Sequence, residues 1–165
     1  MSVAKVREYL RAKGLEDRIS EFAVSSATVE LAAQAVGVEP ARIAKTLSFL
    51  VGEKPVLIVC AGDAKIDNPR YKAFFHTKAK MIPFEQAEEL VGHAPGGVCP
   101  FAIPEGVATY LDASLQRFDI VYPAAGSAAS AVQLTPQELA CAAQNFSGWV
   151  DVCKGWREGE NAQEV

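Results

Sequence analysis

The sequence predicts one α+β domain, in which short helices and strands surround a single hydrophobic core. The chain has 165 residues, a length typical of one domain. Half of its residues are hydrophobic, which is enough for a substantial core. Candidate strands and helices follow one another without the regular alternation of a parallel α/β sheet. Since no repeat or linker divides the chain, residues 1–165 are expected to form one domain with a polar tail from about residue 157.

Helices are predicted where apolar residues recur at helical spacing between capping hydroxyls or prolines and glycine stops. They are expected at residues 2–13, 28–36, 40–45, 70–75, 83–91 and 136–144. The clearest start is Thr135-Pro136-Gln137-Glu138, a capping box with proline at the first helical position. The helix at 40–45 carries Lys45 to its junction with the next strand.

Strands are predicted where β-branched and apolar residues cluster between turn residues. They are expected at residues 19–24, 46–51, 55–60, 80–82, 106–112, 120–123, 131–134 and 149–152. The clearest hairpin joins 46–51 to 55–60 through Gly52-Glu53-Lys54. Its second strand is apolar on both faces and is therefore expected at the centre of the sheet.

Charge and motifs exclude several classes of protein. The net charge is −4, so the chain cannot coat nucleic acid by bulk charge, and any such contact must be local. No apolar run approaches the ~20 residues of a membrane span, and the N-terminus lacks the apolar segment of a signal peptide. Four cysteines without a CxxC spacing indicate free thiols in the cytoplasm. Phosphate-loop, dinucleotide and metal motifs are absent, so no cofactor or metal is expected.

A glycine-proline loop follows His93: Pro95, Gly96, Gly97 and Pro100 exclude a helix and make a poor central strand. Glycine permits close approach to the backbone, and proline makes the chain rigid. Such a loop can bind a small ligand through peptide N–H and C=O groups. The alternative is a tight connection between two elements.

Basic residues offer two candidate sites. An ammonium at Lys45 could neutralise a phosphate or stabilise an oxyanion, although a lysine at such a junction is often only solvated. A basic run could follow a nucleic-acid backbone or be an ordinary solvated face. This run consists of Lys65, Arg70, Lys72, His76, Lys78 and Lys80.

Two further sets of side chains could carry chemistry. Cys99, six residues after His93, is compatible with a Cys–His nucleophile, but no pattern for an orienting residue or oxyanion hole accompanies it. Cys99 could equally be a small residue that fits a tight loop. Asp63 and Asp112 could act as an acid–base pair, but their spacing does not imply that they lie close together.

Taken together, these segments resemble the YbaK/ProRS-editing-domain family of aminoacyl-tRNA deacylases. The resemblance covers roughly residues 3–152, and its weak motifs occur in the order of the family. The matching segments are 28–32, 38–47, 61–63, 92–101, 110–112, 125–126 and 134–136. The resemblance implies a mixed sheet curled into a barrel-like core, with helices packed around it.

The same resemblance implies the activity. Family members hydrolyse mischarged tRNA, most often tRNA for proline that carries a small wrong amino acid such as cysteine or alanine, without a metal. The expected partners are the aminoacylated 3′ adenosine of the tRNA acceptor end and prolyl-tRNA synthetase. A catalytically silent module that binds aminoacyl-tRNA or a nucleotide beside a synthetase remains the alternative.

The resemblance also assigns residues. The family's lysine falls on Lys45, implied to hold the adenosine or its phosphate, and its G-x-x-x-P loop falls on 96–100, implied to hold the aminoacyl group. The expected substrate-binding residues are Thr46, Gly96, Gly97, Val98, Cys99, Pro100, Phe101, Gly126 and Ser127. Alanine-clearing relatives have a histidine shortly after the glycine that matches Gly126. Here residues 126–130 contain none, which weakens an alanine-specific assignment and leaves cysteine or another small amino acid.

Overall fold

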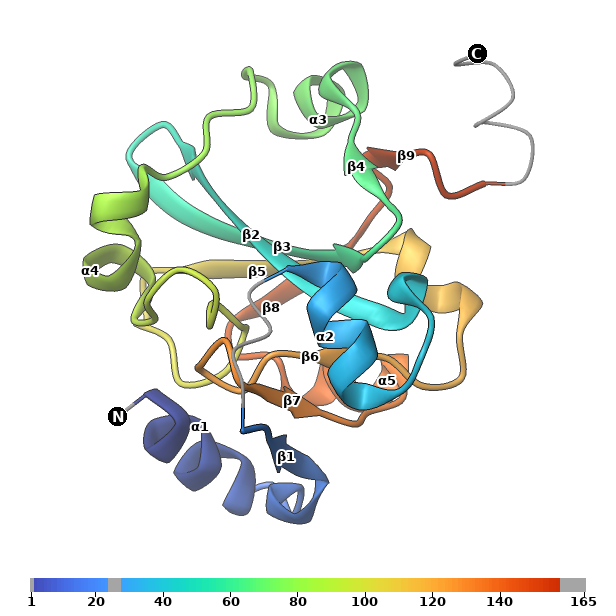
Figure 1. The fold of residues 1–165 in the computed structure, drawn as a ribbon. Helices are drawn as coiled ribbons and strands as arrows, with labels where there is room; N and C mark the ends of the chain where they lie inside the picture. Colours follow the sequence, from blue (N-terminus) through green and yellow to red (C-terminus); the bar gives the residue numbers. More distant parts are fainter. Residues whose placement is uncertain (1, 24–27, 158–165) are drawn as a thin grey trace.

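The computed structural model describes residues 2–23 and 28–157, and a mixed five-stranded sheet forms its centre (Figure 1). The strand order is β6-β2-β3-β5-β8. These strands span Tyr122–Pro123, Ile43–Val51, Lys54–Ala61, Ala108–Asp112 and Phe146–Val150, respectively. The β2–β3 pair is antiparallel and the other three pairs are parallel. This curled mixed sheet confirms the predicted α+β class.

Strand β3 is the central strand, as its apolar composition predicts. It lies between β2 and β5, and residues 56–61 are all buried. In the β2–β3 register, Lys45 lies opposite Cys60 and Thr46 lies opposite Val59. The ladder therefore fixes the backbone of Lys45 against the most deeply buried strand.

Helices and two small sheets surround this centre (Figure 1). The α-helices are α1 (Ser2–Arg11), α2 (Val29–Val36), α3 (Asn68–Phe75), α4 (Ala87–Val91) and α5 (Pro136–Ala142). Single 3-10 turns are η1 (Glu16–Arg18), η2 (Pro40–Arg42), η3 (Phe84–Gln86) and η4 (Ala113–Arg117). The small sheets pair β1 (Ile19–Glu21) with β7 (Ser130–Val132) and β4 (Lys65–Ile66) with β9 (Cys153–Lys154).

The predicted helix signals coincide with observed caps. The Thr28 side chain accepts a hydrogen bond from the Leu31 N–H, and Gly37 ends α2 in the left-handed conformation. The Thr135–Glu138 capping box is complete at the start of α5. Both helices begin where the sequence predicts them, because local hydrogen bonds set their first turns, but α5 ends at Ala142, two residues before its predicted end.

Several predicted boundaries are wrong. The helix expected at 40–45 is one 3-10 turn that ends at Arg42, and β2 begins at Ile43, which pairs with Tyr122 of β6. Lys45 is therefore a strand residue and does not lie at a helix–strand junction. The strand expected at 149–152 starts at Phe146 and ends at Val150. The strand expected at 19–24 ends at Glu21, and residues 24–27 lie outside the described part of the chain.

Two hydrophobic clusters anchor the glycine-proline loop. Cys99 and Phe101 belong to the large cluster between the sheet and the helices. Val98 packs against a smaller cluster, which contains Leu57 and Val91. Adjacent loop residues thus enter two separate cores, which holds the loop rigidly between them. None of the described helices is long and apolar enough to cross a membrane.

Candidate active site

A cavity of about 440 Å³ lies beside strand β2. Its walls come from α2, β2, the segment 81–87, the glycine-proline loop and residues 122–131. The lining residues are Thr28, Val29, Ala32, Ile43, Ala44, Lys45, Thr46, Leu47, Ser48, Met81, Ile82, Phe84, Ala87, Pro95, Gly96, Val98, Tyr122, Ala124, Ser127, Ser130 and Ala131. Among these residues, Lys45 is the only one with a charged side chain.

Lys45 is available to a ligand. It is partly buried, and within the described chain its ammonium has no hydrogen bond or ion pair. The neighbouring Thr46 hydroxyl is buried and also lacks a hydrogen-bond partner among described residues. A buried polar atom without a partner costs free energy, so a ligand that supplied hydrogen bonds here would recover that cost. Both residues line a largely apolar cavity, but they are consecutive in β2, so their side chains point to opposite faces of the strand and their polar groups do not form one strip.

The glycine-proline loop contacts the backbone of residues 126–127. A Cβ atom on Gly97 would lie 2.6 Å from both the carbonyl carbon and oxygen of Gly126. Gly96 lies next to Ala128 and has a φ of +92°, a region that favours glycine. The Gly97 N–H donates to the Ala94 carbonyl over 3.0 Å, which closes a tight turn. Only glycine at position 97 allows the two backbones to approach so closely.

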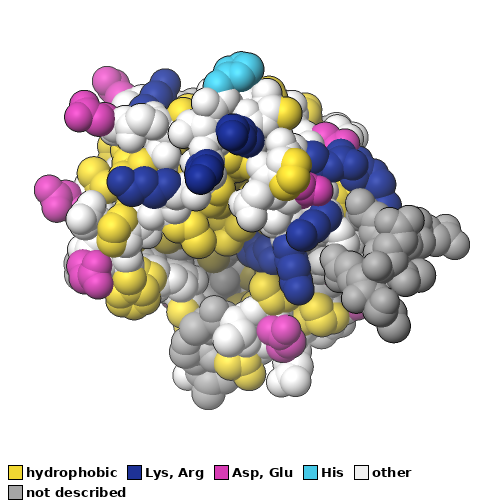
Figure 2. All heavy atoms as spheres, turned by 90° about the horizontal axis from the view of Figure 1, so that it is seen from above, with side chains coloured by type: hydrophobic (Ala, Val, Ile, Leu, Met, Phe, Trp, Pro, Cys, Tyr) yellow, Lys and Arg dark blue, Asp and Glu magenta, His cyan; other side chains and the backbone are white. Residues whose placement is uncertain are grey.

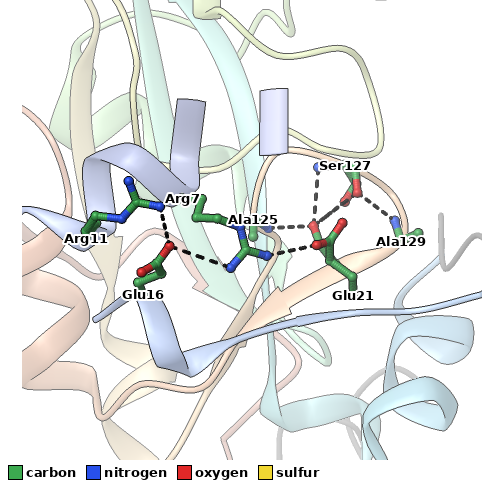
Figure 3. A network of polar contacts seen from close by, with 8 residues as sticks. Arg7, Arg11, Glu16, Glu21, Ala125, Ser127 and Ala129 are labelled. Atoms are coloured by element: carbon green, nitrogen blue, oxygen red, sulfur yellow. Dashed lines mark hydrogen bonds and ion pairs between the residues drawn. The ribbon is translucent and has the colours of Figure 1, made fainter. Parts of the chain in front are cut away.

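Two serines, Ser127 and Ser130, fix the cavity wall formed by residues 122–131, and Figure 3 shows Ser127 with Ala125 and Ala129 in this wall. The Ser130 hydroxyl accepts hydrogen bonds from the backbone N–H of Ala125 and Ser127 and donates to the Ser127 carbonyl. The Ser127 hydroxyl accepts from the Ala129 N–H and contacts the Ser130 hydroxyl at 3.2 Å. This wall is held firmly, because the buried Ser130 hydroxyl ties residues 125 and 127 together and the Ser127 hydroxyl ties residue 129 to them.

Figure 3 also shows how this wall is joined to the N-terminal segment. Arg7 of α1 forms ion pairs with Glu16 (3.9 Å) and with Glu21 of β1 (2.8 Å). Strand β1 pairs with β7, which begins at Ser130. The N-terminal helix therefore supports the cavity wall from outside.

Cys99 and His93 are in contact but buried. The Cys99 sulfur lies 3.5 Å from His93 Nε2, and that nitrogen lies 2.7 Å from the Phe101 carbonyl. Burial raises the pKa of the Cys99 thiol to about 12 and lowers the pKa of His93. A neutral thiol beside a neutral imidazole is suited to packing, and Cys99 does not line the cavity.

The residues expected at the site fall into two groups. Those that line the cavity are Lys45, Thr46, Gly96, Val98 and Ser127. The others lie behind it: Gly97 and Gly126 form the contact between the loops, and Cys99, Pro100 and Phe101 are buried. Any influence of this second group on a ligand passes through the loop that they hold.

Other lining residues were not foreseen in the sequence. Ser130 looks like an ordinary strand residue, and its buried hydroxyl depends on the turn that precedes it. Met81 and Phe84 fit a strand and a helix start, and only their exposure at the cavity distinguishes them. Thr28 caps α2 through its hydroxyl and also lines the cavity.

The predicted basic run lies on an exposed face. Lys65, Lys72, His76, Lys78 and Lys80 are exposed. Arg70 differs, because its guanidinium pairs with Asp67 and Asp151. Figure 2 shows Lys and Arg side chains gathered on this face around a hollow with hydrophobic walls.

Asp63 and Asp112 do not form an acid–base pair: Asp63 pairs with Arg117, and Asp112 caps η4. No cluster of three or more metal-binding side chains occurs among the described residues.

Comparisons with known proteins identify the family of this chain. Residues 24–141 match the family model of the aminoacyl-tRNA editing domain. The chain is 48% identical over 158 residues to the uncharacterised protein YwhH of Bacillus subtilis, covering 94% of this chain and 99% of that protein. It is 31% identical over 90 residues to the proline–tRNA ligase of Aquifex aeolicus, covering 53% of this chain and 16% of the ligase.

A solved structure shares the whole fold. The crystal structure of a proposed trans-editing enzyme for prolyl-tRNA synthetase superposes with a TM-score of 0.84 at 28% identity, covering 93% of this chain and 98% of that one. The family model spans well over half of this chain, including β2 and most of the lining residues. The protein thus belongs to the aminoacyl-tRNA editing domain family.

Proposed function

We propose that this protein is a cytoplasmic trans-editing hydrolase that deacylates mischarged tRNA for proline. The observation that carries the proposal is the unpaired Lys45 ammonium, the single charged side chain among the described residues that line the cavity. A lone cation in a largely apolar, partly enclosed site attracts an anionic ligand strongly, because little water screens the charge. A phosphate or a developing oxyanion at the 3′ end of an aminoacyl-tRNA meets that requirement.

The cavity walls favour a small amino acid. Gly96, Ala124, Ser127 and Ala131 present backbone or short side chains to the interior. Because a synthetase distinguishes similar small side chains by only about 1–3 kcal/mol, separate hydrolysis of the wrong ester is needed. Since residues 126–130 lack the histidine of alanine-clearing relatives, cysteine or another small amino acid is the expected substrate.

The mechanism follows from what lines the cavity. No carboxylate or imidazole occurs among the described lining residues, so orientation and polarisation must supply the acceleration. Water attacks the ester carbonyl carbon, and the bond between that carbon and the ribose oxygen breaks. The ribose oxygen takes a proton from the attacking water, so the products are the free amino acid and a tRNA with a free 3′-terminal hydroxyl. When cysteine is attached, its own thiol can attack the same carbonyl carbon in place of water, which forms a cyclic thioester and passes the thiol proton to the departing ribose oxygen. The Lys45 ammonium offsets the negative charge that develops on the carbonyl oxygen.

Two other functions compete with this proposal. A Cys99-dependent hydrolase is disfavoured, because the thiol is fully buried, is neutral at physiological pH and lies outside the cavity. A binding module without turnover is favoured by the lack of an acid–base group in the described lining. Such a module would hold the same acceptor end beside a synthetase without hydrolysing it.

A deacylation assay separates these functions. The substrates are tRNA for proline charged with cysteine, alanine, serine or proline, and the enzymes are wild type, Lys45→Ala and Lys54→Ala. Lys54, at the exposed start of β3, lies outside the cavity and serves as the matched control. We expect hydrolysis of one mischarged species, a loss of about 100-fold or more in kcat/KM for Lys45→Ala, and no change for Lys54→Ala.

The outcomes are distinct. Wild-type activity in folded Lys45→Ala would refute the assigned contribution of Lys45. Retained binding of charged tRNA without hydrolysis of any species would support the binding module and overturn the hydrolase.

A further inference from the structure

Two large hydrophobic side chains that line the cavity are exposed to solvent. Phe84 is 74% exposed and Met81 is 56% exposed, the highest values among the exposed large hydrophobic residues of the described chain. Both line the cavity, and neither belongs to the two hydrophobic clusters. Their apolar surface therefore contributes little to the core and is available to a ligand.

The backbone under both side chains is held firmly. Residue 81 bridges to Phe49 of β2, and the hydrogen bonds on either side of it measure 2.8 and 3.0 Å. Phe84 follows Pro83, whose carbonyl accepts a 2.9 Å hydrogen bond from the Gln86 N–H and closes the 3-10 turn. An aromatic ring on a fixed backbone loses little conformational entropy when a flat ligand covers it.

Charge around these residues indicates the kind of ligand. Lys78 and Lys80 precede them, are exposed, and form no ion pair with described residues. Exposed Glu85, Glu88 and Glu89 follow them. In Figure 2, acidic side chains gather along the edge where α4 lies in Figure 1, and basic ones lie nearer the hollow. A polyanion would therefore cross the lysine side and avoid the glutamate side.

We propose that Phe84, supported by Met81, is a stacking platform for the 3′-terminal nucleobase of the RNA whose ester enters the cavity. This inference rests on the proposed function and adds a binding residue to it. Single-stranded nucleic acid is typically held by basic residues that follow the phosphates and by aromatic rings that stack on the bases. An open ring, adjacent unpaired lysines and the Lys45 cavity occur together here.

The test uses an RNA hairpin that carries no amino acid. It has a single-stranded 3′ end, and its terminal adenine is replaced by 2-aminopurine. Stacking on an aromatic ring changes the emission of 2-aminopurine, so the readout reports the base itself and needs no catalysis. We expect Phe84→Ala to weaken binding about 5- to 100-fold and to abolish the emission change. Phe84→Trp should retain both.

Phe146→Ala is the matched control. Phe146 is also exposed (37%), but it lies on β8 and does not line the cavity. The Phe146→Ala variant should bind the RNA with the same affinity as wild type. In the deacylation assay, Phe84→Ala should raise KM and leave kcat within about twofold, because stacking contributes equally to the ground and transition states.

The platform and the hydrolase can fail separately. An emission change in Phe84→Ala equal to that of wild type, or no emission change with wild type, overturns the platform. The exposed Met81 and Phe84 side chains would then be a candidate contact surface for a protein partner. A Phe84-dependent signal in a protein that hydrolyses no charged tRNA supports the platform and overturns only the hydrolase.

Discussion

Single atoms decide the shape of the cavity at Gly97. Its missing Cβ leaves room for the carbonyl of Gly126, so the two cavity loops touch through their backbones. The glycines and prolines of this loop predict a rigid turn with accessible peptide groups, but they do not indicate which segment approaches it. The partner lies about thirty residues further along the chain, and no local pattern encodes that contact.

We predict that Gly97→Ala destabilises the protein by about 1–3 kcal/mol, because its Cβ would overlap backbone atoms that cannot rotate away. The same displacement would move residue 97 away from Gly126 and Ser127 and lower deacylation. Urea unfolding and the deacylation assay measure the two effects. Gly106→Ala is the control, since its Cβ would meet nothing within 4 Å. Equal stability of the two variants would contradict the close contact.

The buried pair His93 and Cys99 shows a second limit at the residue scale. Their spacing is compatible with a nucleophile and base, and the structure brings them to 3.5 Å. Burial then disfavours ionisation of both, which sequence spacing cannot reveal. The Phe101 carbonyl accepts a hydrogen bond in this contact and indicates that the pair anchors the loop.

At the scale of elements, local signals predicted the helix starts and long-range pairing decided the strand ends. Thr28 and Thr135 cap their helices through hydrogen bonds to residues three positions away, which a sequence displays directly. Strand β2 extends back to Ile43 only because β6 pairs with it from almost 80 residues away. The β4–β9 pair, which was not predicted, likewise joins residues 65 and 154.

The ion pair between Arg18 and Glu138 of helix α5 makes the stability of the protein depend on pH. Two hydrogen bonds from the Arg18 guanidinium, at 2.9 and 3.0 Å, lower the pKa of Glu138, and its capping bonds act in the same direction. Because the pKa is lower in the folded state, the ionised carboxylate stabilises the fold at neutral pH. This contribution is complete above the unfolded pKa of about 4.3 and is lost as pH falls through the lowered folded value.

Glu138→Gln should therefore reduce the free energy of unfolding by about 1 kcal/mol at pH 7. The difference from wild type should shrink in acid and vanish below the folded pKa. Urea unfolding across this pH range measures it. Glu105→Gln is the control, because the exposed Glu105 carboxylate has no partner among described residues. A difference that persists unchanged in acid would show that the ion pair is not its source.

For the molecule as a whole, the distribution of charge matters more than its sum. The net charge of −4 predicts that the protein does not bind RNA through bulk attraction. The structure nevertheless places unpaired Lys78 and Lys80 beside the segment that lines the cavity. The basic run was visible in the sequence, but its position relative to Lys45 depends on how segment 80–82 pairs with β2.

This arrangement predicts a small, local salt dependence of RNA binding. Each phosphate contact to a single strand contributes about 0.7 to the slope of log affinity against log salt concentration. Lys78→Gln and Lys80→Gln should each reduce the magnitude of that slope by about 0.7, and the double variant by about 1.4. Titration of the 2-aminopurine hairpin at several salt concentrations measures the slope.

Lys13→Gln is the control for the same change in net charge, because the Lys13 ammonium lies over the Tyr9 ring outside the cavity. A wild-type slope in the double variant would place the RNA backbone on another face, whereas a slope lowered equally by Lys13→Gln would attribute the effect to net charge alone.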